Sequence, residues 1–264
     1  MKKHYIALWA LLAAAFAFFA VASAFDSPSI GGHKFKSSGI ADALFAVPEP
    51  EPCEIPAIGD SATATATRPA FPAPLDTAAQ TILFIGDSML EGLGPRLAAY
   101  AEKNGHTLYT VIWYSATSEV WGQSDKLAHY MDMVKPTYVF VCLGANELFV
   151  SDIANKRRGY VRKIISDIDT VPYVWIGPPN WKPDTGINDL VAENASEGSF
   201  FLSNGMHFDR SKDGAHPTRS SAALWLDSVA RWMPQHCAHP IRMERPDKAS
   251  GKARRIFVHQ PNER

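Results

Sequence analysis

The stretch Thr81–Gly94, TILFIGDSMLEGLG, joins a short apolar run to a helix-like pattern through Gly86, Asp87 and Ser88. The apolar run has the length and continuous hydrophobicity of a buried strand, and residues 89–105 predict a helix. A strand that passes directly into a helix places the linking residues at the carboxyl end of the strand, beside free backbone N–H groups. The stretch therefore predicts a βα unit that presents the hydroxyl of Ser88 where a nucleophile would be useful.

The same alternation of strand-length apolar runs and helical patterns continues along the chain. Two helical stripes, in residues 151–169 and 219–233, each place their apolar side chains on one face. Because the strands are almost continuously hydrophobic, we expect a parallel sheet covered on both faces, an α/β fold with three α/β/α layers. Functional sites in such sheets lie at the carboxyl ends of the strands. The expected strands lie within residues 81–86, 107–113, 137–144 and 172–179.

The N-terminal segment, residues 1–25, has the pattern of an export signal. Lys2 and Lys3 precede a long uncharged run that ends in an Ala-x-Ala sequence at Ala24. The run is longer than the core of an ordinary signal peptide and long enough to span a bilayer, so cleavage and retention as an anchor through residues 5–25 are both open. Either outcome predicts a periplasmic or extracellular protein, and retention of the segment would hold it at the inner membrane.

Composition divides the rest of the chain into three parts. Residues 26–78 are rich in Pro, Ala, Ser and Thr without a regular period, which predicts a linker. Residues 79–237 hold the βα pattern and form the expected catalytic domain. Residues 238–264 are basic and lack a helical stripe, so we expect a mobile, solvated extension.

Charge and cysteine content narrow the class of protein further. The 26 basic and 27 acidic residues leave a formal net charge of -1, which gives no field to attract nucleic acid. Cys142 lies in an apolar run and is expected to be a buried free thiol. Cys53 and Cys237 could form a disulfide in an oxidising compartment, or both could be unpaired; the spacing does not decide.

The tripeptide Gly-Asp-Ser occurs twice, and its surroundings separate the two serines. Ser61 lies among Pro, Ala and Thr, with no strand before it and no helix after it, so nothing would hold its hydroxyl in place. Ser88 has both. We therefore expect Ser88 to be the nucleophile and the tripeptide at residues 59–61 to be a coincidence of composition.

A serine nucleophile needs a base and a group that orients the base. The sequence SKDGAHPT supplies Asp213 and His216, three residues apart, just before the last helix. His216 could take the proton from Ser88 while Asp213 holds the imidazole. His207, with Asp209 two residues later, is the competing choice, and we prefer His216 because of the orienting geometry.

Acyl transfer also needs donors for the developing oxyanion. Asn146 follows the strand TYVFVCL with Gly144 at the bend, so its side-chain amide should lie at the same sheet edge as Ser88. The alternative is that Asn146 only caps the turn before the next helix. Asp87, next to the nucleophile, is expected to organise the turn rather than transfer a proton.

Together, these three motifs resemble the SGNH (GDSL-like) hydrolase superfamily. The resemblance covers roughly residues 80–235 and implies a flavodoxin-like sandwich that hydrolyses esters through an acyl-serine intermediate, with no metal and no cofactor. It implies that Ser88, Asp213 and His216 are catalytic, and that Asn146 and the backbone N–H of Ser88 form the oxyanion hole. The motifs are Gly86-Asp87-Ser88, Gly144-Ala145-Asn146-Glu147 and Asp213-Gly214-Ala215-His216.

The chain departs from the family pattern at two places. Glu147 stands where the family usually has Asp, a conservative change outside the triad. The family's second motif carries a glycine whose N–H is another oxyanion donor, whereas VIWYSATSEVWG has no glycine before Gly122. We expect Ser115 to replace it, because a backbone N–H does not require glycine, and Thr117 is the alternative.

Aromatic residues suggest the substrate. Trp121 and Trp181 lie among polar and turn residues and could stack on sugar rings, with Asn180 bonding hydroxyl groups. An exported esterase of this kind would remove O-acetyl or other short acyl groups from an envelope glycan, its O-acylated carbohydrate partner. The alternatives are an O-acetyltransferase for the same glycans and a non-catalytic glycan-binding module. Oligomeric state cannot be deduced.

Overall fold

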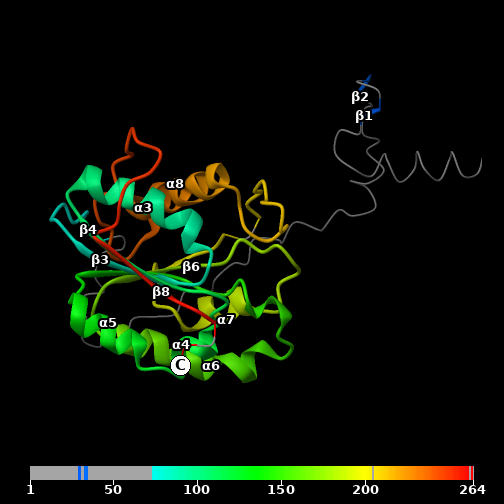
Figure 1. Ribbon diagram of the computed structural model, residues 1–264, viewed down its shortest axis with the longest axis horizontal. Helices are drawn as coiled ribbons and strands as arrows, with labels where there is room; N and C mark the ends of the chain where they lie inside the picture. The colour runs from blue at the N-terminus through cyan, green and yellow to red at the C-terminus, as the bar shows by residue number, and fades with distance from the viewer. Residues whose placement is uncertain (1–28, 31–32, 35–72, 204, 262, 264) are drawn as a thin grey trace, which may run out of the picture. The chain divides into compact units, whose positions relative to one another are not determined.

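The computed structural model describes residues 29–30, 33–34, 73–203, 205–261 and 263 (Figure 1). The chain divides into two units, residues 1–65 and 66–264. In the first unit the described residues form an antiparallel pair, β1 (Ser29–Ile30) and β2 (His33–Lys34). The predicted export signal, Ser61 and Cys53 lie outside the described residues. In the part of the chain that is described, no helix is both long and apolar enough to cross a membrane.

The second unit is built on one six-stranded sheet. Its order is β7-β6-β5-β3-β4-β8, and each neighbouring pair is parallel. The four predicted strands are all present, and β7 and β8 are additional. The strands are β3 (Thr81–Gly86), β4 (Thr107–Trp113), β5 (Tyr138–Cys142), β6 (Tyr173–Ile176), β7 (Phe200–Phe201) and β8 (Arg255–His259).

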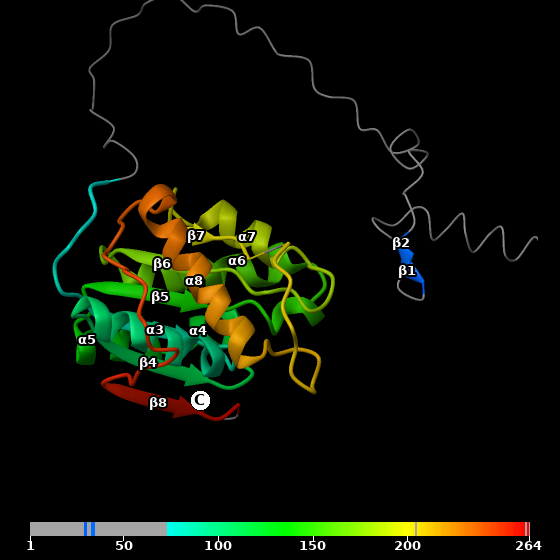
Figure 2. The ribbon, with the colours of Figure 1, turned by 90° about the horizontal axis from the view of Figure 1, so that it is seen from above.

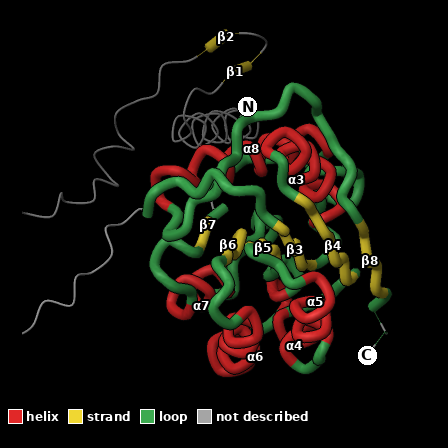
Figure 3. Tube along the Cα trace, turned by 90° about the vertical axis from the view of Figure 1, so that its left-hand side faces the viewer, coloured by secondary structure: helices red, strands yellow, loops and turns green. Residues whose placement is uncertain are grey.

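Helices cover both faces of this sheet, as Figure 3 shows in end-on view. Alternate strand residues point to opposite faces, so Phe84 and Phe140 belong to one core cluster, and Ile85 and Val141 to the other. The predicted three-layer α/β/α fold is therefore confirmed. One layer holds α3 (Leu90–Asn104) and α8 (Arg219–His236); the other holds α4 (Ser118–Gly122), α5 (Lys126–Val134), α6 (Ile153–Ile168) and α7 (Ile187–Asn194).

Gly86 ends β3 in a place too crowded for any side chain. A Cβ atom there would lie 2.3 Å from the carbonyl oxygen of Cys142 and 2.4 Å from Leu90 Cδ1. The absence of a side chain lets the strand turn into α3 directly against its neighbour β5. Close packing at this point sets the position of the next two residues, Asp87 and Ser88.

The order of the strands creates a crevice at the carboxyl edge of the sheet. If the first five strands of the sheet, β3 to β7, are numbered 1 to 5 along the chain, their order in the sheet is 2-1-3-4-5, as in flavodoxin. In this order β4 lies on one side of β3 and β5 on the other. The connections after β3 and β5 therefore leave in opposite directions. Ligands bind at such switch points, and Ser88 follows β3 while Asn146 follows β5.

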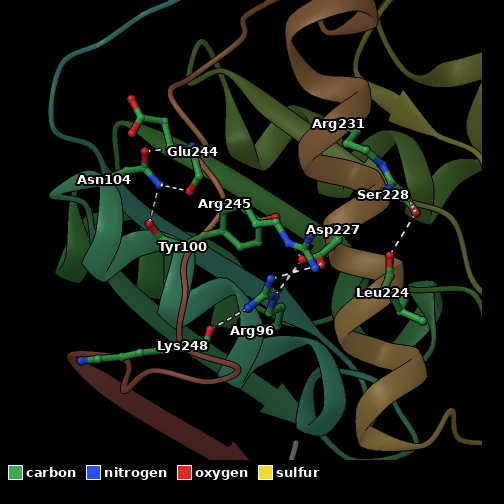
Figure 4. Close-up of polar contacts among 10 residues, drawn as sticks. All are labelled: Arg96, Tyr100, Asn104, Leu224, Asp227, Ser228, Arg231, Glu244, Arg245 and Lys248. Atoms are coloured by element: carbon green, nitrogen blue, oxygen red, sulfur yellow. Dashed lines mark hydrogen bonds and ion pairs between the residues drawn. The ribbon is translucent and has the colours of Figure 1, made fainter.

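The segment after Cys237 corrects one prediction. It is not a mobile extension: β8 pairs in parallel with β4 from Tyr109↔Arg255 to Trp113↔His259, beside the rest of the sheet in Figure 2. The buried ion pair Arg96–Asp227 joins α3 to α8, and Arg96 Nη1 donates to the carbonyl of Lys248 at 2.6 Å (Figure 4). The three apolar residues of β8 lie within a basic segment and are only partly buried at the edge of the sheet, which is why the sequence did not indicate a strand here.

Candidate active site

Ser88 lies in the turn that joins β3 to α3, and the neighbouring aspartate shapes that turn. Asp87 Oδ1 accepts a hydrogen bond from the backbone N–H of Met89 at 2.9 Å. The carbonyl of Ser88 in turn accepts from Glu91 N in the first turn of the helix. These bonds fix the backbone on both sides of the nucleophile, which is the role the sequence analysis assigned to Asp87.

The three predicted catalytic side chains form a continuous hydrogen-bonded path. Ser88 Oγ lies 2.7 Å from His216 Nε2, although 128 residues separate them. The other ring nitrogen, His216 Nδ1, lies 2.8 Å from Asp213 Oδ2. A proton on Nδ1 would leave Nε2 free to accept the serine proton, which is the tautomer that general-base catalysis requires.

The turn that carries the base is held by its own aspartate. Asp213 Oδ1 accepts from the backbone N–H groups of Ala215 at 2.9 Å and His216 at 3.0 Å. These two bonds, followed by the imidazole contact, lower the pKa of Asp213 to about 2. Asp213 is therefore ionised over the whole neutral range and can stabilise an imidazolium at His216.

A cavity of about 550 Å³ opens over the nucleophile. Its wall includes the triad and Ser115, and also polar residues that sequence reasoning did not predict: Glu91, Tyr114, Ser211 and Arg219. The Tyr114 hydroxyl donates to the carboxylate of Glu91. Their sequence positions gave only a weak signal: Tyr114 directly follows β4, Glu91 lies three residues after Ser88, and Ser211 and Arg219 lie close to Asp213 and His216.

Asn146 lies close to the site, but both of its amide hydrogens are engaged. Asn146 Nδ2 donates to Asp87 Oδ2 at 3.2 Å and to the carbonyl of Ala116 at 3.0 Å. An oxyanion could receive a hydrogen bond from this amide only in exchange for one of them, and the longer bond to Asp87 is the easier to give up. The amide is thus tied to the turn that carries the nucleophile.

Ser115, the residue expected in place of the missing glycine, has a backbone conformation that glycine adopts more readily than other residues. Its φ of 57° lies in the left-handed region, and it lines the catalytic cavity. Thr117, the competing candidate, instead caps α4, where its side chain accepts from Val120 N at 3.3 Å. The geometry favours Ser115 as the residue whose N–H could face an oxyanion.

Two buried carboxyl groups lie behind the nucleophile. Burial, with a smaller contribution from the nearby carboxylate of Glu147, raises the pKa of Asp87 to about 7, although the hydrogen bond from Met89 N opposes this rise. Burial also raises the pKa of Glu147, although it accepts a hydrogen bond from Ser118 N and lies near the positive charge of Arg157. Glu147 therefore places a buried acid in contact with the start of α4.

The structure overturns one of the three predicted substrate residues and reassigns another. Trp121 is 0% exposed, with its ring edge-to-face against Trp113 at 5.4 Å, so it cannot stack on a sugar. Polar neighbours in sequence misled the prediction, because the single turn of α4 points this ring into the core. Asn180 donates to Asp184 Oδ2 at 3.1 Å and holds its own loop.

Trp181 remains partly accessible, in an aromatic pair that was not predicted. Its ring lies 5.4 Å from that of Phe149, which is 64% exposed. Lys182 Nζ lies over both rings. His207, the rejected alternative base, is exposed and is not part of the cavity wall.

Cys142 and Cys237 both lie in the described part of the chain, and both are buried. Cys142 is buried, and burial raises the pKa of its thiol well above the usual value. Cys237 is buried against the Tyr138 hydroxyl at 3.3 Å, but its expected partner Cys53 lies outside the described residues, so the pairing stays a prediction. Within the described ranges, no group of His, Cys, Asp and Glu side chains has the arrangement of a metal site.

Comparisons with known proteins find solved structures that are similar to this chain. No protein-family model matches the sequence, and neither does any curated protein. Similar solved structures include a psychrotrophic esterase, EstA from Pseudoalteromonas sp., at 17% identity and a TM-score of 0.43, covering 58% of this chain and 98% of that one.

Two further structures have comparable likeness. TesA is 17% identical, with a TM-score of 0.46, over 59% of this chain and 99% of that one. A Clostridium thermocellum family 3 carbohydrate esterase is 18% identical, with a TM-score of 0.43, over 57% of this chain and 94% of that one. Two of these three similar structures are described as esterases, and all three have low sequence identity to this chain.

Proposed function

We propose that this chain is a serine ester hydrolase with Ser88 as its nucleophile. The observation that carries the proposal is the path from Ser88 Oγ to His216 Nε2 at 2.7 Å and from His216 Nδ1 to Asp213 Oδ2 at 2.8 Å. This path lies at the carboxyl edge of the sheet, at the point where the strand order reverses. A nucleophile, a base and an orienting carboxylate in hydrogen-bond contact are the minimum for acyl transfer.

The chemistry follows from the roles of these groups. Ser88 Oγ attacks the ester carbonyl carbon while His216 takes its proton, and the carbonyl oxygen becomes an oxyanion. The backbone N–H groups of Ser88 and Ser115 and the amide of Asn146 are the candidate donors to that oxygen. The imidazolium then protonates the leaving alcohol. Water, activated by the same imidazole, hydrolyses the acyl-serine and restores Ser88.

For the alcohol part of the substrate we propose a carbohydrate of the cell envelope. The polar cavity wall, with Ser115, Ser211 and Arg219, offers partners for sugar hydroxyls. The pair Phe149–Trp181 presents an exposed aromatic face just after Asn146, at the same sheet edge. The signal-like sequence of residues 1–25 supports a site of action outside the cytoplasm.

The first test measures hydrolysis of p-nitrophenyl acetate by the full chain and by Ser88→Ala, His216→Ala and Ser61→Ala. We expect kcat to fall about 10⁴-fold or more in the first two variants, because each removes a member of the triad. Ser61→Ala should match the wild type. Equal loss in Ser61→Ala, or full activity in Ser88→Ala, would overturn the assignment.

The second test addresses the carbohydrate. Acetate release from an O-acetylated oligosaccharide is compared with p-nitrophenyl acetate hydrolysis in the wild type and in Phe149→Ala. The ratio of the two kcat/KM values should fall about tenfold when the aromatic face is lost. Acetyl transfer to a sugar hydroxyl without net release would identify a transferase instead, and oligosaccharide binding without turnover would identify a binding module.

A further inference from the structure

A second cavity, of about 340 Å³, lies beside the catalytic one between α3, β4 and the C-terminal segment. Unlike the catalytic cavity, it has a mainly apolar wall. Charged side chains contribute only through Glu91 and Lys252, both exposed. Its volume falls within the range of about 300–1,000 Å³ that is typical of small-molecule sites. The apolar wall consists of Leu90, Pro95, Ala98, Ile112, Ala253 and Ile256.

The C-terminal segment forms the outer wall of this apolar cavity and is hydrogen-bonded to both α3 and β4. Gly251 N donates to the carbonyl of Pro95 at 2.8 Å, and Arg254 N donates to that of Leu108 at 2.7 Å. A Cβ atom on Gly251 would lie 2.6 Å from the backbone nitrogen of Ala99, so only glycine allows this close approach. Further along the segment, Asn104 bonds both backbone groups of Glu244 (Figure 4). The cavity is therefore a built feature of the fold rather than a gap under a loose tail.

The apolar cavity adjoins the catalytic cavity at Glu91. Glu91 lines both, and the Tyr114 hydroxyl that donates to its carboxylate belongs to the catalytic wall. Leu90, in the apolar wall, is only two residues from the nucleophile Ser88. Because both walls include Glu91, a chain attached to the acylated serine would reach the apolar wall by passing this residue.

We propose that the apolar cavity binds the aliphatic chain of the acyl group that Ser88 removes, which rests on the proposed esterase function. An acetyl group has no methylene to place there, so the preferred acyl group is longer than the acetyl favoured by the sequence. Each methylene transferred from water into an apolar wall contributes about fourfold in affinity. kcat/KM should therefore rise about fourfold with each methylene added to the acyl chain, until the cavity is full.

Gly94 offers a direct way to fill the cavity. It faces the cavity from α3, and a Cβ atom there would meet only Thr110 Cγ2, at 3.9 Å, an ordinary contact. Gly94→Leu should occupy the space meant for the acyl chain, and Gly94→Ala is a milder version that also favours the helix. Gly159→Leu is the matched control, because Gly159 is exposed on α6 with open space around it.

The experiment measures kcat/KM for p-nitrophenyl acetate, butyrate, hexanoate and octanoate with the full chain, so that the alcohol stays constant. In the wild type and Gly159→Leu, the octanoate-to-butyrate ratio should exceed tenfold. In Gly94→Leu this ratio should fall at least tenfold, with a smaller fall in Gly94→Ala. Octanoate should also bind Ser88→Ala protein in calorimetry and lose that binding in the Ser88→Ala, Gly94→Leu double variant.

The outcomes separate this proposal from the esterase function. A flat or falling chain-length series, with hydrolysis still dependent on Ser88, would overturn the acyl cavity and leave the esterase intact. An equal loss in Gly159→Leu would overturn it as well. If chain length matters only in alkyl acetates, the cavity binds the alcohol and the acyl assignment is wrong. No hydrolysis of any ester by the wild type would overturn both proposals.

Discussion

Asp213 and Asp87 lie on either side of the contact between Ser88 and His216, yet one is exposed and the other is buried. Asp213 is exposed on a turn, accepts three hydrogen bonds and has a pKa of about 2. Asp87 is fully buried behind Ser88, near a second acid, with a pKa of about 7. The comparison shows that hydrogen bonds from a local turn can hold a carboxylate ionised in water, whereas burial against the sheet penalises the charge.

The largest effect on activity is expected for a change at Asp213, the exposed one of the two aspartates. Asp213→Asn keeps the oxygen that accepts from the N–H groups of Ala215 and His216. The amide nitrogen that replaces Oδ2 cannot accept a hydrogen bond from Nδ1–H of His216, so the required tautomer is no longer favoured. We expect kcat/KM for p-nitrophenyl acetate to fall about 10³- to 10⁴-fold, with little change in thermal unfolding. Asp209→Asn, in the rejected His207 pair, is the control; a similar loss there would reverse the choice of base.

A change at Asp87, the buried aspartate, should mainly affect the free energy of unfolding and how that energy depends on pH. The pKa of Asp87 rises on folding from 3.8 to about 7, so the folded protein binds a proton more readily than the unfolded chain does. The free energy of unfolding should therefore fall as pH rises from about 4 to 7, by up to roughly 4 kcal/mol.

Asp87→Asn removes this dependence, so the variant should gain stability relative to the wild type as pH rises. Urea unfolding at pH 4, 5.5, 7 and 8 would measure the difference between the two proteins. A difference that does not change with pH would show that Asp87 is ionised in the folded state. Asp209→Asn, at an exposed aspartate, should give a small and nearly constant difference.

The amide that touches the buried aspartate comes next in size. Asn146→Ala removes a candidate oxyanion donor, and we expect kcat to fall about 10²- to 10³-fold with a smaller change in KM. Asn155→Ala, at an exposed asparagine at the start of α6, is the control. If Asn146→Ala lowered thermal stability but left kcat within threefold of the wild type, the amide would serve the turn and not the oxyanion.

The smallest effect concerns the strained residue on the exposed side of the site. Ser115→Gly should raise the free energy of unfolding by up to about 1 kcal/mol, because glycine adopts the positive φ of 57° without strain. Lys135→Gly, at a helix C-cap with φ of 48°, should give a similar gain. A clear loss of activity in Ser115→Gly would show that the serine side chain, and not its N–H, takes part in the reaction.

Local regions of the site were predictable, and regions that depend on distant packing were not. Asp213 and His216 lie in one turn, so their spacing alone suggested the pair. The contact between His216 and Ser88 spans 128 residues and was expected because a serine nucleophile needs a base and because the family resemblance implies it; no local pattern encodes it. Glu91 and Tyr114 meet across two segments with no signature of their own, and Trp121 was wrong because its polar neighbours in sequence are not its neighbours in space.

The sequence by itself determined the layers of this fold and the position of Ser88 after the first strand of the sheet, because strands buried on both faces are continuously apolar. Only the tertiary structure decided that residues 255–259 extend the sheet, since their apolar run of three residues is short and lies within a basic segment that has the pattern of a solvated tail. It also decided which carboxyl groups are buried and where the apolar cavity lies. Both depend on contacts between segments that no local pattern encodes.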